Sequence, residues 1–276
     1  MNKIQFFDGG MGTMLQAGGL KAGELPETLN LKNPDLVYSV HKAYADAGAD
    51  IISTNTFGVN SLKFDNVSEV VQAAVALAKK AGKKVALDMG PLGKLLKPSG
   101  ELEIEKAYEL YKEVILAAKD NVDIVFFETM TDLYEIKAGV LAAKENCNLP
   151  IFVSMMFDSN ERLLTGADIE TAVTTLEGLG IDAIGMNCGL GPAEMLPLAK
   201  KMRSLTSLPM LLNPNAGLPR SVDGKTVFDV DAESFAEMMK EFASLGVSYL
   251  GGCCGTTPAH IKALVSACKD AESFIP

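Results

Sequence analysis

Histidine is scarce in this chain of 276 residues, which holds only His41 and His260. No His-x-x-x-His pair occurs, and no serine–histidine–acid set suggests itself. A hydrolytic zinc site would want histidine or carboxylate ligands and a base beside the bound water, so a zinc hydrolase is disfavoured. We expect His41, within a predicted helix, and His260, at the start of another, to have structural or solvent-facing roles.

Positive charge is also limited, since 25 Lys and Arg stand against 35 Asp and Glu, the net charge is −10, and no basic run occurs. Nucleic acid and anionic membrane surfaces are therefore not expected as partners. No apolar run approaches the roughly 20 residues of a membrane span. The apolar stretch at the start is too short for a signal peptide. We therefore expect a cytoplasmic protein with reduced cysteines.

The five cysteines include no Cys-x-x-Cys pair and lack the spacing of a disulfide framework. Cys147 and Cys268 lie near predicted helix ends without a glycine context, so we expect them to be core residues. The other three have glycine neighbours: Cys188 in Met-Asn-Cys-Gly, and Cys253 and Cys254 in Gly-Gly-Cys-Cys-Gly-Thr-Thr. Thiols in a reducing compartment serve as metal ligands, nucleophiles or core residues.

Eight short apolar runs alternate with helical patterns, which predicts an α/β fold, a (β/α)8 TIM barrel in a single domain over residues 1–276. A doubly wound open sheet is the alternative, because one missed strand changes the count. The predicted strands are 4–7, 51–54, 85–89, 124–128, 151–156, 183–187, 210–213 and 249–252. The predicted helices are one between Asn33 and Gly48, then 68–81, 103–119, 133–145, 168–179, 193–205, 232–244 and 258–268.

The three glycine-flanked cysteines follow the sixth and eighth predicted strands, and the carboxyl ends of barrel strands carry catalytic residues. Consecutive strand residues face opposite ways, so Cys253 and Cys254 reach one ion only if the backbone bends there, as the adjoining glycines allow. Three thiolates would hold Zn²⁺ with a fourth position open for water or substrate. Core packing or a vicinal disulfide remain alternatives for the Cys253–Cys254 pair.

The order of several motifs along nearly the whole chain resembles the homocysteine S-methyltransferase family. Within that family the chain is most similar to the homocysteine-binding barrel of cobalamin-dependent methionine synthase. The resemblance implies a zinc barrel with Cys188, Cys253 and Cys254 as ligands and catalytic residues, which methylates the thiol of homocysteine to give methionine. The motifs are Asp-Gly-Gly-Met-Gly-Thr at 8–13, Thr-Asn-Thr-Phe-Gly at 54–58, Asp-Met-Gly-Pro at 88–91, Phe-Glu-Thr at 127–129, Leu-Thr-Gly at 164–166, Met-Asn-Cys at 186–188, Pro-Asn-Ala-Gly at 214–217 and Gly-Gly-Cys-Cys-Gly at 251–255.

Substrate contacts are expected at further strand ends. Asp8 and Glu128 could accept hydrogen bonds from the substrate ammonium, as the resemblance implies, although a turn-forming or helix-capping carboxylate is the plainer alternative. The loop that includes Gly9 and Gly10 could aim backbone N–H groups at the carboxylate, or be only a tight turn. Asn187 is expected to contact substrate, although hydrogen bonding to local backbone is as good an explanation, and the same holds for Asn215 in the pocket wall.

The methyl donor is expected to be a corrinoid, methylcobalamin, carried by a separate protein or by further domains of a larger enzyme. S-adenosylmethionine or S-methylmethionine are alternative donors, and a non-catalytic subunit that binds homocysteine or zinc is another class. An aldolase-type barrel would need a strand-end lysine for a Schiff base, and none of the eight predicted strand ends carries one. The segment 90–101 is a candidate lid over the pocket.

Overall fold

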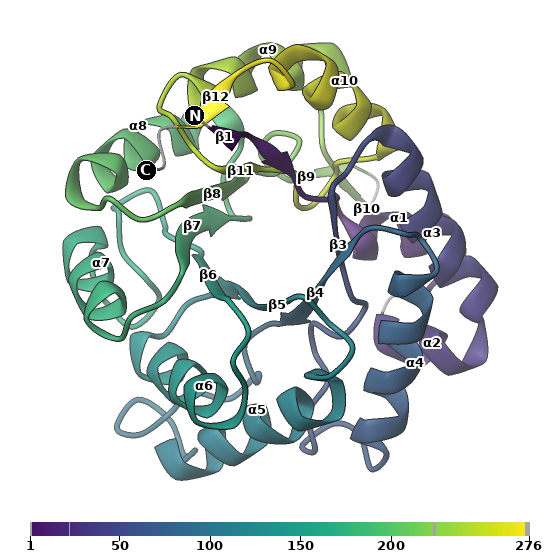
Figure 1. The fold of residues 1–276 in the computed structure, drawn as a ribbon, viewed down its shortest axis with the longest axis vertical. Coiled ribbons are helices and arrows are strands. Elements are labelled where there is room, and N and C mark those ends of the chain that lie inside the picture. The colour runs from purple at the N-terminus through teal and green to yellow at the C-terminus, as the bar shows by residue number, and fades with distance from the viewer. Residues whose placement is uncertain (1, 22, 223–224, 274–276) are drawn as a thin grey trace.

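A computed structural model describes residues 2–21, 23–222 and 225–273. Eight parallel strands follow one another around a ring in the order β2-β11-β8-β7-β6-β5-β4-β3, and a parallel bridge from Phe7 to Ile51 closes it (Figure 1). The predicted α/β barrel is thereby confirmed. The strands are β2 (Gln5–Phe6), β3 (Ile51–Ser53), β4 (Lys84–Met89), β5 (Ile124–Met130), β6 (Ile151–Met155), β7 (Ala183–Asn187), β8 (Met210–Asn213) and β11 (Tyr249–Leu250).

Eight helices surround this ring, each close to its predicted limits (Figure 1). Asn33 caps the first of them by accepting a hydrogen bond from the Leu36 N–H, and Gly48 ends it in the left-handed conformation with φ 107°. The helices are α3 (Pro34–Ala47), α4 (Val67–Lys79), α5 (Ile104–Ala118), α6 (Leu133–Asn146), α7 (Ile169–Gly178), α8 (Pro192–Leu205), α9 (Ala232–Ala243) and α10 (Pro258–Cys268).

The barrel also carries shorter elements, which the sequence patterns did not predict. Three lie between the first two barrel strands: α1 (Met11–Ala17), the 3₁₀ turn η1 (Pro26–Thr28) and α2 (Leu29–Lys32). Two antiparallel pairs are added, β9 (Arg220–Val222) with β10 (Lys225–Val227), and β1 (Asn2–Lys3) with β12 (Glu272–Ser273). Elements of two to seven residues hold too few side chains to show a periodic pattern.

The lumen of the barrel changes from apolar to polar along the strands. Strand alternation aims every second residue inward, and the inward side chains at mid-strand form one buried apolar cluster: Phe7, Ile51, Ala86, Ile124, Phe126, Phe152, Ala183 and Leu211. Two to four residues further along the strands, the same inward face becomes polar. Its members there are Ser53, Asp88, Glu128, Ser154, Asn187 and Asn213. The carboxyl ends therefore carry a polar layer on an apolar plug.

The opposite end of the barrel is fastened by aspartates that precede strands. Asp50, Asp123 and Asp182 each stand one residue before a strand and accept a backbone N–H from a neighbouring strand. Their donors are the N–H groups of Phe6 at 2.9 Å, Val85 at 2.7 Å and Ile151 at 2.8 Å. These side chains satisfy amides that would otherwise begin a ladder unpaired. Stability is thus built at the end away from the polar layer.

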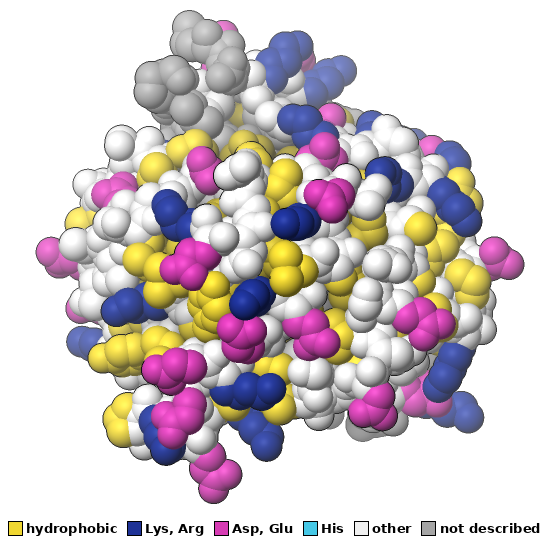
Figure 2. Space-filling model, turned by 60° about the horizontal axis from the view of Figure 1, so that its bottom comes forward, with side chains coloured by type: hydrophobic (Ala, Val, Ile, Leu, Met, Phe, Trp, Pro, Cys, Tyr) yellow, Lys and Arg dark blue, Asp and Glu magenta, His cyan; other side chains and the backbone are white. Residues whose placement is uncertain are grey.

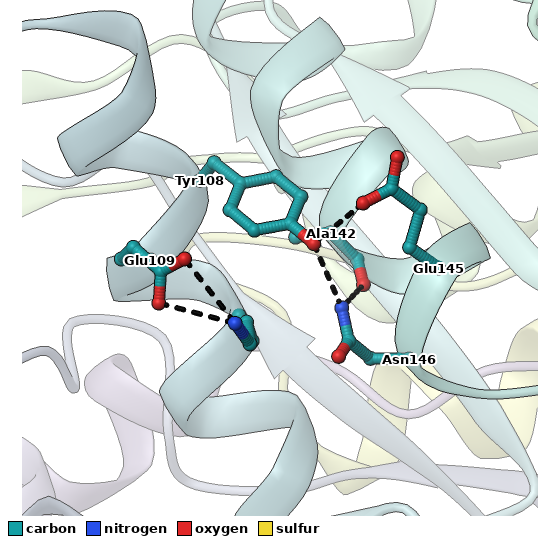
Figure 3. Close-up of polar contacts among 6 residues, drawn as sticks. Tyr108, Glu109, Ala142, Glu145 and Asn146 are labelled. Atoms are coloured by element: carbon teal, nitrogen blue, oxygen red, sulfur yellow. Dashed lines mark hydrogen bonds and ion pairs between the residues drawn. The ribbon is translucent and has the colours of Figure 1, made fainter.

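Polar contacts join α5 to α6 on the outside of the barrel, where Tyr108 lies between both helices (Figure 3). Its hydroxyl donates to Glu145 Oε2 at 2.6 Å and accepts from Asn146 Nδ2 at 3.1 Å. One face of the molecule shows acidic and basic side chains mixed with apolar ones, without a patch of one sign (Figure 2). Among the described residues, no helix combines the length and the apolar character needed to cross a bilayer.

Candidate active site at the carboxyl ends of the strands

A cavity of about 410 Å³ opens where the polar layer meets the βα loops. Its lining includes the three glycine-flanked cysteines and four carboxylates. The residues are Asp8, Gly9, Gly10, Met11, Gly12, Thr13, Leu25, Pro26, Glu27, Ser53, Thr54, Asn55, Phe57, Gly58, Lys63, Asp88, Glu128, Thr129, Cys188, Asn213, Gly252, Cys253 and Cys254. Cavities at this end of such barrels are where chemistry is placed.

The sulfur atoms of Cys188, Cys253 and Cys254 all lie within 4.8 Å of one another. The Sγ atoms of Cys188 and Cys254 are 3.8 Å apart. Cys188 directly follows inward-facing Asn187, so a regular strand would turn its thiol outward. Its backbone instead takes the left-handed conformation, with φ 58°. This strained turn, which the sequence did not reveal, lets Cys188 face the cysteine pair that follows β11.

The Cys253–Cys254 pair lies in a turn after β11 and is held by hydrogen bonds to the segment that follows β8. The Cys253 N–H donates to the Pro214 carbonyl at 2.9 Å, and the Cys254 carbonyl accepts from the Ala216 N–H at 3.0 Å. Gly255 then takes φ 80°, the left-handed region that glycine adopts without strain. The predicted departure from strand geometry is therefore present, and it brings both thiols to the same side.

The thiols share their protons unevenly. Hydrogen bonds from the Cys253 and Cys254 thiols lower the pKa of Cys188 well below that of a free cysteine. The same hydrogen bonds to Cys188 raise the pKa values of Cys253 and Cys254. The cluster thus releases one proton readily and keeps the other two, a state in which a divalent cation would displace protons as it binds.

Asp8 is buried beside β3, where Ser53 holds both of its oxygens. The Ser53 N–H donates to Oδ2 at 2.9 Å, and the Ser53 hydroxyl donates to Oδ1 at 3.0 Å. Burial raises the pKa of Asp8 to about 7, against the lowering effect of those hydrogen bonds. A buried carboxylate of this kind gains strongly from a cation placed next to it.

Glu128 leaves β5 toward the cavity at an irregularity in its pairing with β6. Burial raises its pKa, and the negative charge of Asp8 raises it further. The carboxyl group of Asp88 on the neighbouring strand lies within hydrogen-bonding reach of Glu128, and burial raises the pKa of Asp88 as well. Asp88 belongs to the Asp-Met-Gly-Pro motif, which by itself predicts no role at the site for this residue.

Asn187 lies behind the cavity and does not line it. Its Oδ1 accepts from the Thr129 N–H at 2.7 Å and from the Ser154 hydroxyl at 2.8 Å. Its Nδ2 donates to Thr129 Oγ1 at 2.7 Å and approaches Cys253 Sγ at 3.7 Å. Because Thr129 has the left-handed φ of 56°, this amide supports a strained turn after Glu128. Its position favours local hydrogen bonding over the expected contact with substrate.

Asn215 is likewise absent from the cavity lining. Its side chain hydrogen-bonds the thiol of Cys188, which contributes to the low pKa of that thiol. Both asparagines that the sequence placed in the pocket wall are therefore found in the layer that supports the sulfur cluster and the turn after Glu128.

The glycine-rich segment after β2 is the start of a helix and not an open loop, because α1 begins at Met11. Gly9 and Gly10 do line the cavity, but the Gly10 N–H donates to Thr256 Oγ1 at 3.1 Å. Helix geometry leaves the first N–H groups of α1 without intrahelical partners. Any contact with an anion would therefore come from those groups and not from Gly10.

Neither His41 nor His260 lines the cavity. His41 is fully buried in α3, and burial lowers its pKa to about 4. His260 accepts from the Thr257 N–H through Nδ1 and contacts the Val230 carbonyl through Nε2, so it fastens the start of α10. Cys268 is buried in the main core and Cys147 packs at its edge, as expected.

The candidate lid is anchored at its base. The Leu92 N–H donates to Glu135 Oε1 at 2.6 Å, and Leu92 and Leu96 are both buried. Leu102 pairs with Leu96 in a parallel bridge. Only the tip between these anchors is left for movement, and a lid function stays a prediction.

A sulfur cluster and buried carboxylates at the mouth of a (β/α)8 barrel define a class of thiol-rich barrel enzymes. Comparison with known proteins identifies the family within this class. The family model described as homocysteine S-methyltransferase matches residues 5–268. Methionine synthase of Mycobacterium tuberculosis is 33% identical over 96% of the chain, which spans 24% of that protein, and the Mycobacterium leprae enzyme is 32% identical over 97%, which spans 25%. The chain belongs to the homocysteine S-methyltransferase family, which confirms the expected enzyme class, a methyltransferase.

Solved structures agree on the fold. The metallated form of the homocysteine methyltransferase MmuM from Escherichia coli superposes with a TM-score of 0.80 at 24% identity, over 96% of both chains. Its oxidized form gives a TM-score of 0.81 at the same identity and coverage. At this identity the likeness concerns the barrel architecture alone.

Proposed function

We propose that Cys188, Cys253 and Cys254 bind one zinc ion and that the chain transfers a methyl group to the thiol of homocysteine. The donor in this proposal is a methylated corrinoid carried by a separate protein or domain. The observation that carries it is the convergence of three sulfurs on a cavity that also holds the buried carboxylates Asp8 and Glu128.

The residues fit zinc in number, kind and spacing. Zinc is bound by thiolates at about 2.3 Å in tetrahedral geometry, which places two sulfurs about 3.8 Å apart. The Cys188–Cys254 separation of 3.8 Å matches that value. When bound, zinc supplies a Lewis acid that holds a substrate thiol as its nucleophilic thiolate at neutral pH. Three protein ligands leave one position for that sulfur.

The remaining residues of the cavity orient the amino acid. Asp8 and Glu128 lie beside the sulfur cluster, burial raises the pKa of each, and neither forms an ion pair with a described lysine or arginine. An α-ammonium supplies a positive charge and ionises both carboxylates. The first turn of α1 faces the same space and offers N–H groups to the α-carboxylate. Homocysteine then presents its sulfur to the cluster.

A donor presented by another domain or protein is supported by the length of the relatives and by the cavity rim. The chain spans about a quarter of the methionine synthases that it matches, so further domains or a partner protein belong to this proposal. Leu25 and Phe57 line the cavity yet remain 37% and 39% exposed. Apolar side chains at an open rim suit a bulky donor presented by a protein better than a small free one. A cytoplasmic location, also part of the proposal, would keep the thiols reduced.

One experiment tests the chemistry. The chain is loaded with zinc, mixed with homocysteine and methylcobalamin, and methionine and cob(I)alamin are followed together. Equal amounts of both products are expected. The Cys147→Ala variant, altered outside the cluster, is the matched positive control, and Cys188→Ala is the negative one. Homocysteine binding without turnover by any donor would contradict the proposal and favour a non-catalytic binding subunit.

A second donor class has one observation in its favour. The cavity holds four carboxylates, and Lys63 is its single basic residue within the described chain. Glu27 is buried there, and its Oε2 has no hydrogen-bond partner among the described residues. Such an acidic cavity attracts cations, and S-adenosylmethionine and S-methylmethionine are cationic sulfonium donors. The contrary result of the assay is methionine from either sulfonium compound and none from methylcobalamin or a methylated corrinoid protein. That result would make a sulfonium compound the donor in place of the corrinoid.

A further inference from the structure

Asp88 is the carboxylic acid of the cavity to which neither the motifs nor the proposed function gives a role. It stands near the end of β4, and its side chain points into the lumen in register with Phe126. Only 5% of its surface is exposed. It lines the same cavity as Asp8 and Glu128. Three acidic side chains therefore meet above the apolar plug of the barrel.

The backbone of Asp88 is fixed by two threonines of the neighbouring segment. Its N–H donates to Thr54 Oγ1 at 3.0 Å, and its carbonyl accepts from the Thr56 hydroxyl at 2.6 Å. The two threonine hydroxyls are themselves 2.6 Å apart. A group held at both backbone atoms has little freedom to move its side chain away, which is the pre-organisation that a binding residue requires.

The carboxyl group of Asp88 has one close side-chain neighbour, the carboxyl group of Glu128. Its Oδ1 atom is buried and receives no hydrogen bond from any N–H or O–H group within the described chain. No described lysine or arginine forms an ion pair with this residue. A buried acceptor without a donor is costly, and such atoms in folded proteins usually receive one from a ligand or solvent.

We infer that Asp88 is the third acid of the ammonium pocket: its carboxyl group aligns Glu128 and accepts a substrate N–H at Oδ1. This inference rests on the proposed function, since homocysteine supplies the ammonium. An α-ammonium has three N–H donors, whereas both oxygens of Asp8 already accept from Ser53. Asp8, Glu128 and Asp88 together offer one acceptor to each N–H. A ligand that lacks the α-amino group should therefore bind less tightly than homocysteine.

The test compares two ligands that differ only in the amine. Dissociation constants of L-homocysteine and of 4-mercaptobutyrate are measured by calorimetry on zinc-loaded protein. Wild-type protein is expected to prefer homocysteine. Asp88→Ala should weaken homocysteine binding by about 10- to 100-fold, the usual cost of a lost charged hydrogen bond. It should leave 4-mercaptobutyrate within about twofold, because that ligand brings no N–H to Oδ1.

Asp88→Asn is the conservative variant. Its amide donates to Glu128 and keeps an oxygen at the Oδ1 position, so homocysteine affinity should stay within about threefold of wild type. Asp123→Asn, at the opposite end of the barrel, is the control for a general effect of replacing an aspartate of the barrel by asparagine. Zinc content and melting temperature are recorded for every variant.

The outcomes separate this inference from the proposed function. Equal losses for both ligands in Asp88→Ala, or no loss for homocysteine, would overturn the role of Asp88 while leaving the enzyme class untouched. A wild-type protein that binds neither thiol would overturn the proposed function and this inference together. Should Asp88→Ala not fold, the carboxyl carbon of Asp88 in wild-type protein is followed by NMR. It should shift with homocysteine and not with 4-mercaptobutyrate; equal shifts would contradict the inference.

Discussion

The Sγ atoms of Cys188 and Cys254 lie 3.8 Å apart, although 66 positions separate the two residues in the sequence. β7 and β11 are not neighbours in the barrel, because β8 lies between them. The contact therefore depends on the left-handed turn at Cys188 on one side and the glycine turn at Gly255 on the other. Both turns aim their thiols across the mouth of the barrel.

Zinc content should depend on this contact. Cys188→Ala removes one of three thiolates, and two ligands hold zinc poorly. We expect bound zinc to fall from one ion per chain to near none, and methyl transfer to fall by more than about 100-fold. Metal analysis and the methionine assay measure both. Cys147→Ala should keep both at wild-type levels, and a Cys188→Ala protein with full zinc and activity would refute the ligand assignment.

Without zinc, the same proximity should make the cluster sensitive to oxidation. Hydrogen peroxide would take two electrons and two protons from Cys188 and Cys254, which gives a disulfide and two water molecules. The low pKa of Cys188 supplies the attacking thiolate. Peptide mass mapping of metal-free protein should find this pair linked, and zinc-loaded protein should resist. Linkage of Cys147 or Cys268 in its place would contradict the prediction.

Asp8 should lower the stability of the ligand-free protein at neutral pH, although it contributes to homocysteine binding. Its folded pKa of about 7 lies above its ordinary value of 3.8. The folded state therefore binds the proton more tightly, and the stability that this group contributes at low pH is lost as pH rises from about 4 to about 7. Asp8→Asn removes this loss, so in the absence of ligand it should be more stable than wild type above pH 7, by up to about 4 kcal/mol.

Denaturant unfolding at pH 5 and pH 8 checks this effect, since the difference between Asp8→Asn and wild type should grow with pH. Asparagine can still accept from the Ser53 N–H and donate to the Ser53 hydroxyl. Homocysteine affinity should nevertheless fall, because the ammonium loses an ionised partner. A variant that is less stable at both pH values would show that Asp8 is held mainly by its hydrogen bonds.

Asn187 should matter for stability more than for direct contact with substrate. Asn187→Ala leaves the Thr129 N–H and the Ser154 hydroxyl without their acceptor, at a cost of about 1–3 kcal/mol for each buried group. We expect a loss of about 3 kcal/mol in unfolding free energy. We also expect a lower affinity for homocysteine, because the turn that positions Glu128 becomes less rigid. Asn146→Ala, at the outer contact of α5 and α6, should cost less than about 1 kcal/mol.

The sequence patterns predicted the barrel well because its strands are buried on both faces and its helices carry clear caps. Asn33 and Gly48 mark both ends of α3, as the residue types demand. The short elements around η1 and the two antiparallel pairs were missed, since they are held by contacts with distant segments. Asn55, for example, donates to the Pro26 carbonyl at 3.0 Å and fastens η1 to the loop after β3.

The convergence of the three cysteines on one cavity was predictable to the same degree. Cysteines beside glycines at strand ends indicate a metal cluster, and Asp8 and Glu128 stand at strand ends too. Asp88 and Asn187 were harder: a strand-end aspartate or asparagine has many structural uses, and its role depends on which side chains from other strands surround it. The left-handed conformation of Cys188 had no sequence signal, because such turns normally favour glycine or asparagine.

The sequence by itself determined the alternation of strand and helix, the residue types at each strand end and the thiol chemistry. These follow from local periodicity, capping and side-chain chemistry. Only the tertiary structure decided which of those ends converge, which carboxyl groups share a hydrogen bond and which buried oxygen lacks a partner. Closure of the ring from Phe7 to Ile51 sets these relations, because it places residues from distant strands around one cavity whose burial then shifts their pKa values.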